Sequence, residues 1–407
     1  MVNQDRIWHR LMQVAEIGKL ETGGVSRTSF SEEDRQVKEL VAGFMKEAGL
    51  RVYEDTAGNL IGRKEGTEPG ASVVMTGSHL DTVYNGGNFD GVLGVIGGIE
   101  ALQTMNEQGI SLTHPIEVVA FTDEDSQRFN FGLVGSRAMT GTLYPDDLLH
   151  RDRDGITIAE AMRQAGYDPE LIRRSARPKH SIKAFVELHI EQGKVLETAA
   201  APVGIVQGIY SQLFDKFIME GEAGHAGTTP MGLRKDPLLA AAETLLAIEA
   251  AARSEDTVVA TTGRIETYPG GINIIPGRVE FSLDIRGLGD LQRDAFESRA
   301  VSEATRICWA RGVKATVESK NKNSGAICDP VIIDTIARAC ERLGVNAVPM
   351  MSGAGHDAMR LALICPVGMI FIRSRNGISH TPEEYSSPED CRDGVNVLYQ
   401  TLMELAK

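Results

Sequence analysis

The stretch VVMTGSHLDTVYNGGNFDG, residues 73–91, joins an apolar run to a turn of histidine, aspartate and glycine. The run Ser72–Thr76 predicts a buried strand, and a helical pattern, Val92–Met105, follows the turn. Strand, polar turn and helix in this order are the repeating unit of an α/β sheet. In such a sheet we expect reactive side chains at the C-terminal ends of the strands.

The same pattern continues on both sides of this stretch and returns after about residue 327. The predicted elements are the strands Ile116–Thr122, Ile182–Leu188 and Val367–Ile372, the helices Ile156–Ala165 and Val331–Leu343, and a closing helix from Pro388. We therefore predict a catalytic α/β domain made of residues 1–210 and 327–407.

Residues 211–326 show a different order of elements, which predicts a compact α+β unit inserted into the α/β domain. The strands are Leu213–Glu220, Val258–Thr267, Arg278–Arg286 and Val313–Glu318, and the helices are Pro237–Arg253 and Leu291–Arg311. The predicted fold class is thus α/β with an inserted α+β domain.

Composition argues against several partners. The 42 basic and 56 acidic residues give a net charge of −14, which disfavours nucleic acid and anionic membranes. No run approaches the roughly 20 apolar residues of a membrane span, and the N-terminus lacks a signal-peptide core, so we expect a cytoplasmic protein. The five cysteines show no CxxC spacing, which predicts reduced thiols.

Five of the nine histidines lie beside acidic or glycine-rich turns, and five such positions together favour a functional set over separate structural roles. They are His79, His189, His225, His356 and His380. The remaining four, which we assign to the surface, are His9, His114, His150 and His180.

His79 would leave the first strand at the C-terminal edge of the sheet. Asp81, two residues later, can accept the second imidazole N–H and fix the tautomer, as metal-bound histidines require. Asp90 lies in a glycine-flanked turn and could bridge two cations. A turn or helix-cap role for His79 is the alternative, and the two nearby carboxylates favour a metal ligand.

The sequence FTDED, residues 121–125, again follows an apolar strand. Its three consecutive carboxylates would repel one another unless cations neutralise them, although a solvated acidic turn is the alternative. We expect one carboxylate to bind metal and its neighbour to stay free as a base. His189 and His380 add imidazoles after strands, and this sulfur-free donor set suits Mn, Co, Ni or Zn. No HExxH motif indicates a single-zinc protease.

The inserted unit has polar residues of its own. His225 lies between glycines in EAGHAG, and Asn273 lies in a turn. Arg286 ends a strand and suits a bidentate grip on a carboxylate, although a salt bridge with Asp284 fits the sequence equally well. We assign no role to His356 from the sequence.

Together these motifs resemble the dinuclear-metal aminoacylase/carboxypeptidase superfamily, and within it the N-carbamoyl-L-amino acid hydrolases and allantoate amidohydrolases. The resemblance extends over essentially the whole chain, through GSHLDTVYNGGNFDG, FTDED, VELHIEQG, GHAGTTPM, GGINIIP, SGAGHD and SHTPEE. It implies a catalytic α/β domain and an inserted lid, residues 211–326, that also forms a homodimer.

The resemblance also implies roles for individual residues. The implied ligands are His79 and His189 for one metal, His380 and Asp125 for the other, and Asp90 bridging the two. The implied catalytic residues are Glu124 as general base, Asp81 beside His79, and the partner subunit's His225 as oxyanion stabiliser. The implied substrate contacts are Gln192, His225, Asn273, Arg286 and Gly355, of which Asn273 and Arg286 would hold a carboxylate.

In one place the sequence departs from the family pattern, which is Glu-Glu followed by glycine. This chain has Glu124-Asp125-Ser126. The aspartate reaches one methylene less far, a difference that bears on metal preference and occupancy at this position.

The implied function is hydrolysis of N-carbamoyl-L-amino acids to an L-amino acid, ammonia and CO2. Two divalent metal ions per subunit, manganese first, would activate a water from which Glu124 takes a proton. Allantoate is the nearest alternative substrate because it also carries a ureido group and a carboxylate. Further alternatives are an aminoacylase or peptidase, and a non-catalytic binding relative, although a pure binder needs no free carboxylate beside its metals.

Overall fold

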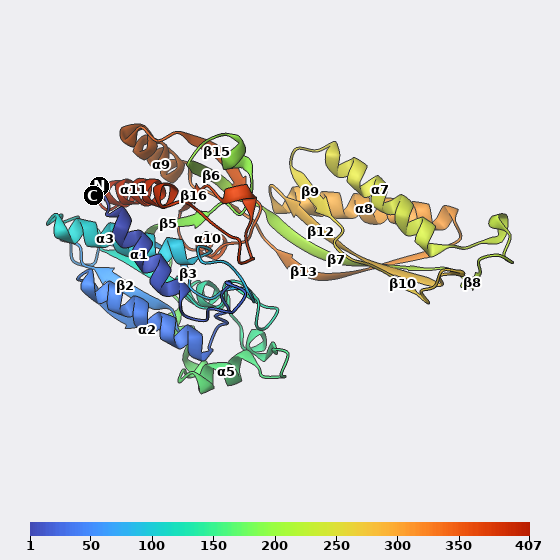
Figure 1. The fold of residues 1–407 in the computed structure, drawn as a ribbon, viewed down its shortest axis with the longest axis horizontal. Coiled ribbons are helices and arrows are strands. Elements are labelled where there is room, and N and C mark those ends of the chain that lie inside the picture. The colour runs from blue at the N-terminus through green and yellow to red at the C-terminus, as the bar shows by residue number, and fades with distance from the viewer. The chain divides into compact units, whose positions relative to one another are not determined.

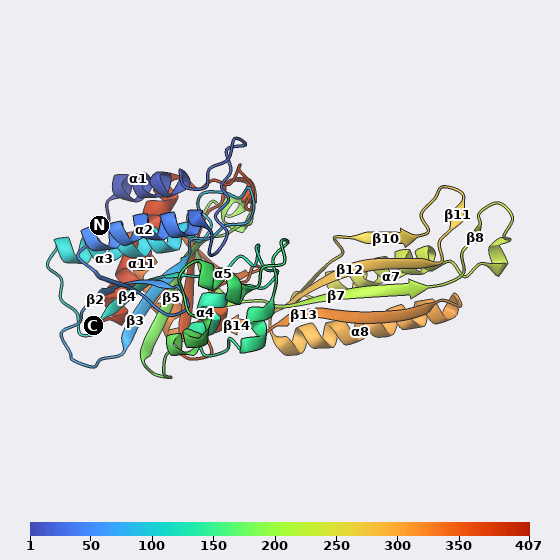
Figure 2. The same ribbon diagram turned by 90° about the horizontal axis from the view of Figure 1, so that it is seen from below.

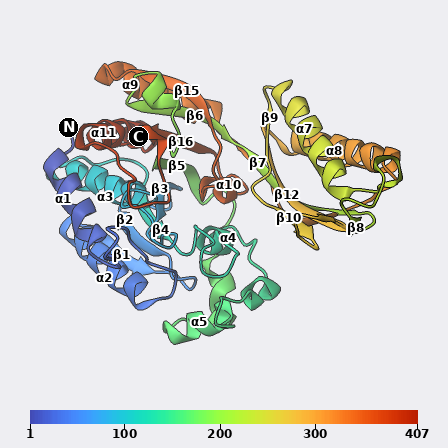
Figure 3. The same ribbon diagram turned by 45° about the vertical axis from the view of Figure 1, so that its right-hand side comes forward.

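The computed structural model describes residues 1–407, except for the side chains of Lys320 and Asn321. The chain divides into two compact units. Unit 1 comprises Met1–Gly208 and Ile327–Lys407, and unit 2 comprises Ile209–Ala326. In Figures 1 and 3, unit 2 runs from yellow-green through yellow to orange, and unit 1 carries the blue-to-green segments and the brown-to-red segments.

Unit 1 is built on a mixed nine-stranded sheet. Its strands are β1 (Arg51–Glu54), β2 (Leu60–Lys64), β3 (Val73–His79), β4 (Ile116–Phe121), β5 (Ile182–Ile190), β6 (Val203–Ile209), β14 (Ala326–Ile327), β15 (Ala347–Ser352) and β16 (Val367–Ile372). The order is β1-β2-β4-β3-β5-β16-β6-β14, with β15 paired to β6. Four adjacent strands at the centre of the sheet, β4, β3, β5 and β16, run parallel to one another. Their C-terminal ends therefore meet at one edge of the sheet.

Helices cover these strands, which explains why the strands read as continuous apolar runs in the sequence. The helices are α1 (Gln4–Ala15), α2 (Glu32–Glu47), α3 (Val92–Glu107), α4 (Val134–Met139), α5 (Ile158–Gln164), α6 (Val195–Thr198), α9 (Pro330–Leu343), α10 (Ala358–Leu361) and α11 (Pro388–Leu405). Every residue of β3, β4 and β16 is buried. Figure 2 shows α1, α2 and α3 on one side of the sheet, where they share an apolar core with α9 and α11.

Local sequence signals set where several helices begin. Asp329 caps α9 and Ser387 caps α11, and in both cases a proline occupies the first turn. Ser31 caps α2 by accepting the main-chain N–H of Asp34 at 3.2 Å. These caps bring the helices to the sheet with satisfied N-termini.

Unit 2 contains a five-stranded antiparallel sheet under two helices. Its elements are β7 (Ser211–Glu220), β8 (Gly224–His225), α7 (Pro237–Arg253), β9 (Val258–Thr261), β10 (Ile265–Tyr268), β11 (Ile274–Ile275), β12 (Arg278–Gly287), α8 (Asp290–Ala310) and β13 (Lys314–Asn323). Burial alternates along β12, because one face of the sheet packs against α7 and α8. The order is β10-β12-β7-β13, with β9 also on β12.

The single strand predicted over Val258–Thr267 is wrong, since this segment forms β9 and β10 with a break that contains Gly263. Both pieces pair with β12, β9 with residues 284–287 and β10 with residues 278–281. The long β12 therefore accommodates two short partners along one edge.

All five cysteines lie among the described residues and are buried thiols without disulfide bonds. Among the helices of the described chain, none combines the length and apolarity that a bilayer crossing needs.

Candidate metal centre and active site

Two buried histidines stand at the ends of neighbouring strands. His79 is the last residue of β3, and His189 lies inside β5, which continues past the predicted end at Leu188 to Ile190. Their ring centroids are 5.9 Å apart. In each ring Nδ1 donates to a main-chain oxygen, from His79 to Asp81 at 2.9 Å and from His189 to Ile190 at 3.0 Å. Nε2 therefore carries the lone pair that a metal would use.

The prediction that the Asp81 carboxylate accepts the His79 N–H is wrong. That carboxylate lies 4.0 Å from Nδ1, and the main-chain oxygen takes the hydrogen bond instead. The carboxylate accepts the main-chain N–H groups of Glu124 and Asp125, at 3.3 and 3.2 Å. Asp81 thus fixes the turn that carries the acidic residues.

The three carboxylates of residues 123–125 point to three different partners. Asp123 accepts the hydroxyl of Ser29. Glu124 Oε2 lies 3.8 Å from His79 Nε2, and Asp125 Oδ1 lies 3.9 Å from His380 Nε2. Asp123 has a φ of 57°, a left-handed conformation that separates the directions of successive side chains. The turn can therefore offer a metal ligand and a base side by side.

Ser126, which stands where the family pattern has glycine, also has a left-handed φ of 60°. This conformation costs a non-glycine residue about 1–2 kcal/mol, part of which the greater freedom of unfolded glycine offsets. We expect Ser126→Gly to raise the free energy of unfolding by about 0.5 kcal/mol, measured by urea titration of the metal-free protein. The control Ser302→Gly, on the helix α8, should lower it by about 0.5–1 kcal/mol. A destabilised Ser126→Gly would contradict the expectation.

Asp90 lies between the two imidazoles that come from distant parts of the sequence. Its Oδ1 is 3.3 Å from His189 Nε2, and its Oδ2 is 3.1 Å from His380 Nε2. The next residue, Gly91, has a φ of 66°, and a Cβ there would lie 2.5 Å from the His79 ring. Glycine is therefore what allows the turn to approach His79 closely.

The donor atoms form compact groups, within each of which one atom per residue lies no more than 4.8 Å from the others. The groups are His79, Asp90 and His189; Asp90, Asp125 and His380; His79, Glu124 and Asp125; and Glu187, His189 and His356. The first two share Asp90. Asp125 belongs to two groups, so its shorter side chain still reaches the cluster.

The electrostatics of this cluster fit divalent cations. Burial and the charge of Asp90 raise the pKa of Asp125 to about 7. Burial and neighbouring carboxylates also raise the pKa of Glu124 well above its usual value. Burial opposes protonation of His79, yet the surrounding carboxylates, Glu124 first, raise its pKa. Among the described residues Asp125 Oδ2 is buried without a hydrogen-bond partner, and added positive charge would satisfy it.

Gln192 and Gly355, the predicted substrate contacts of unit 1, both adjoin the cluster. Gln192 Nε2 donates to Asp90 Oδ1 at 3.0 Å and lies 3.2 Å from His380 Nε2. Gly355 precedes His356, whose ring centroid is 4.5 Å from that of His189. His356, which had no role assigned from the sequence, therefore packs against a candidate ligand.

Glu187 is a buried residue of the site that the sequence reasoning missed. Its carboxylate accepts the Ser78 hydroxyl at 2.8 Å and the Ala358 main-chain N–H at 3.0 Å. It thereby ties β3, just before His79, to α10. An acidic residue inside the apolar run 182–188 was the available signal.

In unit 2 the structure brings His225 and Asn273 together but leaves Arg286 apart. The Ala226 N–H donates to the Asn273 main-chain oxygen at 3.0 Å, and β8 pairs with β11. Arg286 instead lies opposite Gln212, at the start of β7, and its Nη2 is 2.9 Å from Asp284 Oδ2. Figure 2 shows β8 and β11 beyond the far end of β7. Gln212 and Glu220 mark the two ends of β7 and, at about 3.4 Å per residue, are roughly 27 Å apart. Arg286 lies at the Gln212 end, and His225 and Asn273 lie beyond the Glu220 end.

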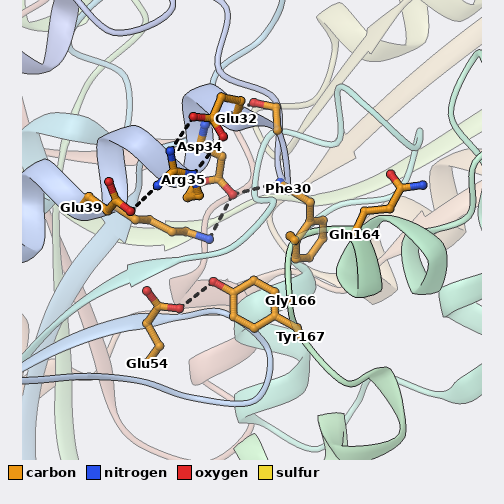
Figure 4. A pocket seen from close by; sticks show the side chains of 12 residues that line it. Phe30, Glu32, Asp34, Arg35, Glu39, Glu54, Gln164, Gly166 and Tyr167 are labelled. Carbon is orange, nitrogen blue, oxygen red and sulfur yellow. Dashed lines mark hydrogen bonds and ion pairs between the residues drawn. The ribbon is translucent and has the colours of Figure 1, made fainter.

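A separate cavity of about 450 Å3 lies beside α2 and is lined by none of these donors (Figure 4). Its charged groups pair with neighbouring polar groups. Lys38 pairs with Asp34 at 3.0 Å, and the Tyr167 hydroxyl donates to Glu54 at 2.6 Å. The cavity therefore offers no competing catalytic cluster.

The central parallel strands bring imidazoles and buried carboxylates together at one edge of the sheet, and a further carboxylate lies beside them. This arrangement defines a hydrolase with candidate sites for divalent cations. The chain belongs to peptidase family M20/M25/M40, whose sequence profile matches residues 75–404. The α/β fold class and the resemblance noted from the motifs are confirmed.

Relatives place the chain within one part of this family. It is 54% identical to an N-carbamoyl-L-amino acid amidohydrolase of Geobacillus stearothermophilus, over 100% of both chains. It is 43% identical to an N-carbamoyl-L-amino-acid amidohydrolase of Pseudomonas sp. (strain NS671), over 99% of this chain and 98% of the relative. Allantoate deiminase 2 of Glycine max is 36% identical, over 92% and 84%. The crystal structure of a hydantoinase/carbamoylase family amidase from Burkholderia multivorans matches with a TM-score of 0.94 and 35% identity, over 100% and 98%.

Proposed function

We propose that the protein hydrolyses the carbamoyl C–N bond of N-carbamoyl-L-amino acids, releasing the L-amino acid, ammonia and CO2. The observation that carries the proposal is the position of Asp90, within 3.3 Å of His189 Nε2 and 3.1 Å of His380 Nε2. Two groups of donors therefore share one carboxylate while Glu124 stands beside them. The relatives with 54% and 43% identity support the choice of substrate.

The donor groups suggest how two cations would be held. His79, His189 and Asp90 would bind one, and Asp90, Asp125 and His380 the other. We propose manganese, with Co, Ni or Zn as alternatives that suit the same nitrogen and oxygen donors. When bound, the cations would polarise the ureido carbonyl and lower the pKa of the attacking water.

Glu124 would supply the proton transfers of the reaction. Its carboxylate lies beside the cluster, 3.8 Å from His79 Nε2, and its main-chain N–H donates to Asp81, which holds the turn. It would accept a proton from the attacking water and return it to the leaving nitrogen. The partner subunit's His225 would donate to the oxygen that becomes negative.

The proposed enzyme is a cytoplasmic homodimer that uses residues of both copies at each site. His225 and Asn273 lie too far from Arg286 within one chain to contact the same small substrate. A joint grip on its carboxylate by Asn273 and Arg286 therefore requires one residue from each copy. On α7, Leu239 and Leu246 are 44% and 68% exposed, which provides apolar surface for a second copy. The five buried thiols suit a reducing compartment.

Mixing two inactive variants tests this shared site. His225→Ala and Arg286→Ala should each be nearly inactive. After dissociation and reassociation together, roughly a quarter of the wild-type rate should return, because half of the dimers are mixed and each has one intact site. The rate of ammonia release measures the result. No recovery in dimers shown to be mixed would mean that both residues act from one chain.

The substrate is tested by ammonia release from N-carbamoyl-L-methionine and from allantoate, with and without added manganese. We expect manganese-dependent turnover with the carbamoyl amino acid to exceed that with allantoate at least about tenfold in kcat/KM, a difference of about 1.4 kcal/mol in transition-state binding. A preference for allantoate would favour the second candidate function, which the Glycine max relative supports. Cleavage of N-acetyl-L-methionine or a dipeptide instead would indicate an aminoacylase or peptidase. No turnover of any of them would indicate a binding protein.

A further inference from the structure

Glu384 is a buried carboxylate that joins the two turns carrying Asp90 and His380. Its Oε1 accepts the main-chain N–H groups of Phe89 and Asp90, at 2.9 and 3.1 Å. Its Oε2 accepts the Ser379 hydroxyl at 2.6 Å and the His380 N–H at 3.4 Å. Four donors from two segments nearly 300 residues apart in sequence thus converge on one side chain.

The turn before Asp90 is shaped to receive this carboxylate. A Cβ on Gly87 would lie 2.2 Å from Glu384 Oε1 and 2.4 Å from Glu384 Cβ. Only a residue without a side chain leaves this space free, so the turn and Glu384 fit each other closely. Glu384 is 4% exposed, and water therefore competes little for its hydrogen bonds.

Asp90 and His380 are the pair whose relative position decides whether two cations can share a carboxylate. Their side chains meet at 3.1 Å, although one follows β3 and the other follows β16. Asp125 reaches the cluster independently, through the turn that Asp81 holds. His79 and His189 are fixed by their own strands. Of the two groups that share Asp90, only that of Asp90, Asp125 and His380 therefore has members on both of the turns that Glu384 joins.

We infer that Glu384 is a positioning residue that sets the distance between Asp90 and His380 and so determines the affinity of the cation site they share with Asp125. The inference rests on the proposed function, because it requires the metal centre described there. Glu384 belongs to none of the donor groups found among the described residues, and acts by holding the main chain of both ligands.

The variants Glu384→Gln and Glu384→Asp separate the parts of this role. Glutamine keeps the length but turns an NH2 group toward two of the four donors. Aspartate keeps both oxygens but is one methylene too short to reach both turns. The control Glu383→Gln removes the same charge from the exposed neighbouring residue.

Isothermal titration of the metal-free protein with Mn²⁺ alone is the measurement. In Glu384→Gln we expect one of the two binding steps to weaken about 10- to 100-fold, the usual effect of losing a partner that orients a ligand. This should be the step that disappears in His380→Ala, and the other step should change less than about threefold. Glu384→Asp should show the same selective loss, and Glu383→Gln none.

Each other outcome has a distinct meaning. Wild-type affinities at both steps in both Glu384 variants would overturn the inference and leave the proposed function standing, provided that the wild-type protein hydrolyses its substrate. Equal weakening of both steps, or loss of cooperative thermal unfolding in both metal-free variants, would overturn it by assigning Glu384 a general structural role. A wild-type protein that binds fewer than two Mn²⁺ ions would overturn both the inference and the metal centre.

Discussion

Replacing Glu124 by glutamine is expected to lower kcat by about 10²- to 10⁴-fold while the protein keeps its metal ions. Glutamine has nearly the same shape, and the main-chain N–H that Asp81 accepts is unchanged. The amide cannot take a proton from water or deliver one to the leaving nitrogen. Glu124 Oε2 is 3.8 Å from His79 Nε2, so a charge next to the cluster is also lost.

The measurement combines ammonia release under saturating substrate with metal analysis of the dialysed protein. Metal content distinguishes a lost base from a lost ligand, because Glu124 also belongs to one donor group with His79 and Asp125. Glu68→Gln, at an exposed position, should behave as wild type. Substantial residual turnover in Glu124→Gln would refute its assignment as the base.

Replacing Asp90 by asparagine is expected to remove both cations and lower turnover by at least about 10³-fold, which corresponds to several kcal/mol of charge stabilisation. Asp90 is the residue that the two principal donor groups share. A neutral amide has one oxygen donor where the carboxylate offers two. At least one cation would then be left with two of its proposed protein ligands, and the other would lose the charge of its shared ligand.

Metal content after dialysis should fall from about two ions per chain to fewer than one, and excess manganese should not restore wild-type turnover. The far-ultraviolet circular dichroism and thermal unfolding of the metal-free variant show whether the fold persists. We expect the fold to persist, because burying the charged carboxylate of Asp90 costs desolvation free energy that a neutral amide of nearly the same size largely avoids. An Asp90→Asn protein that retains two ions would rule out the shared carboxylate.

The site could be predicted in its components but not in all of its contacts. The polar turns after β3, β4 and β16 were recognisable because a buried parallel strand ends in a sharp change from apolar to polar residues. The bond between His79 and Asp81 was placed on the wrong oxygen, because residue spacing does not reveal which acceptor faces the ring. Glu187 and Glu384 were missed as organisers of the site, since their partners come from other elements.

The sequence by itself determined the alternation of strands and helices, the inserted α+β unit and the kinds of donor atoms available. These depend on local periodicity and on residue chemistry, which short segments express without the rest of the chain. Only the tertiary structure decided that Asp90 meets both His189 and His380, and that His225 and Asn273 lie far from Arg286 in one chain. Such distances depend on strand order and on how turns pack, and these follow from contacts between segments hundreds of residues apart.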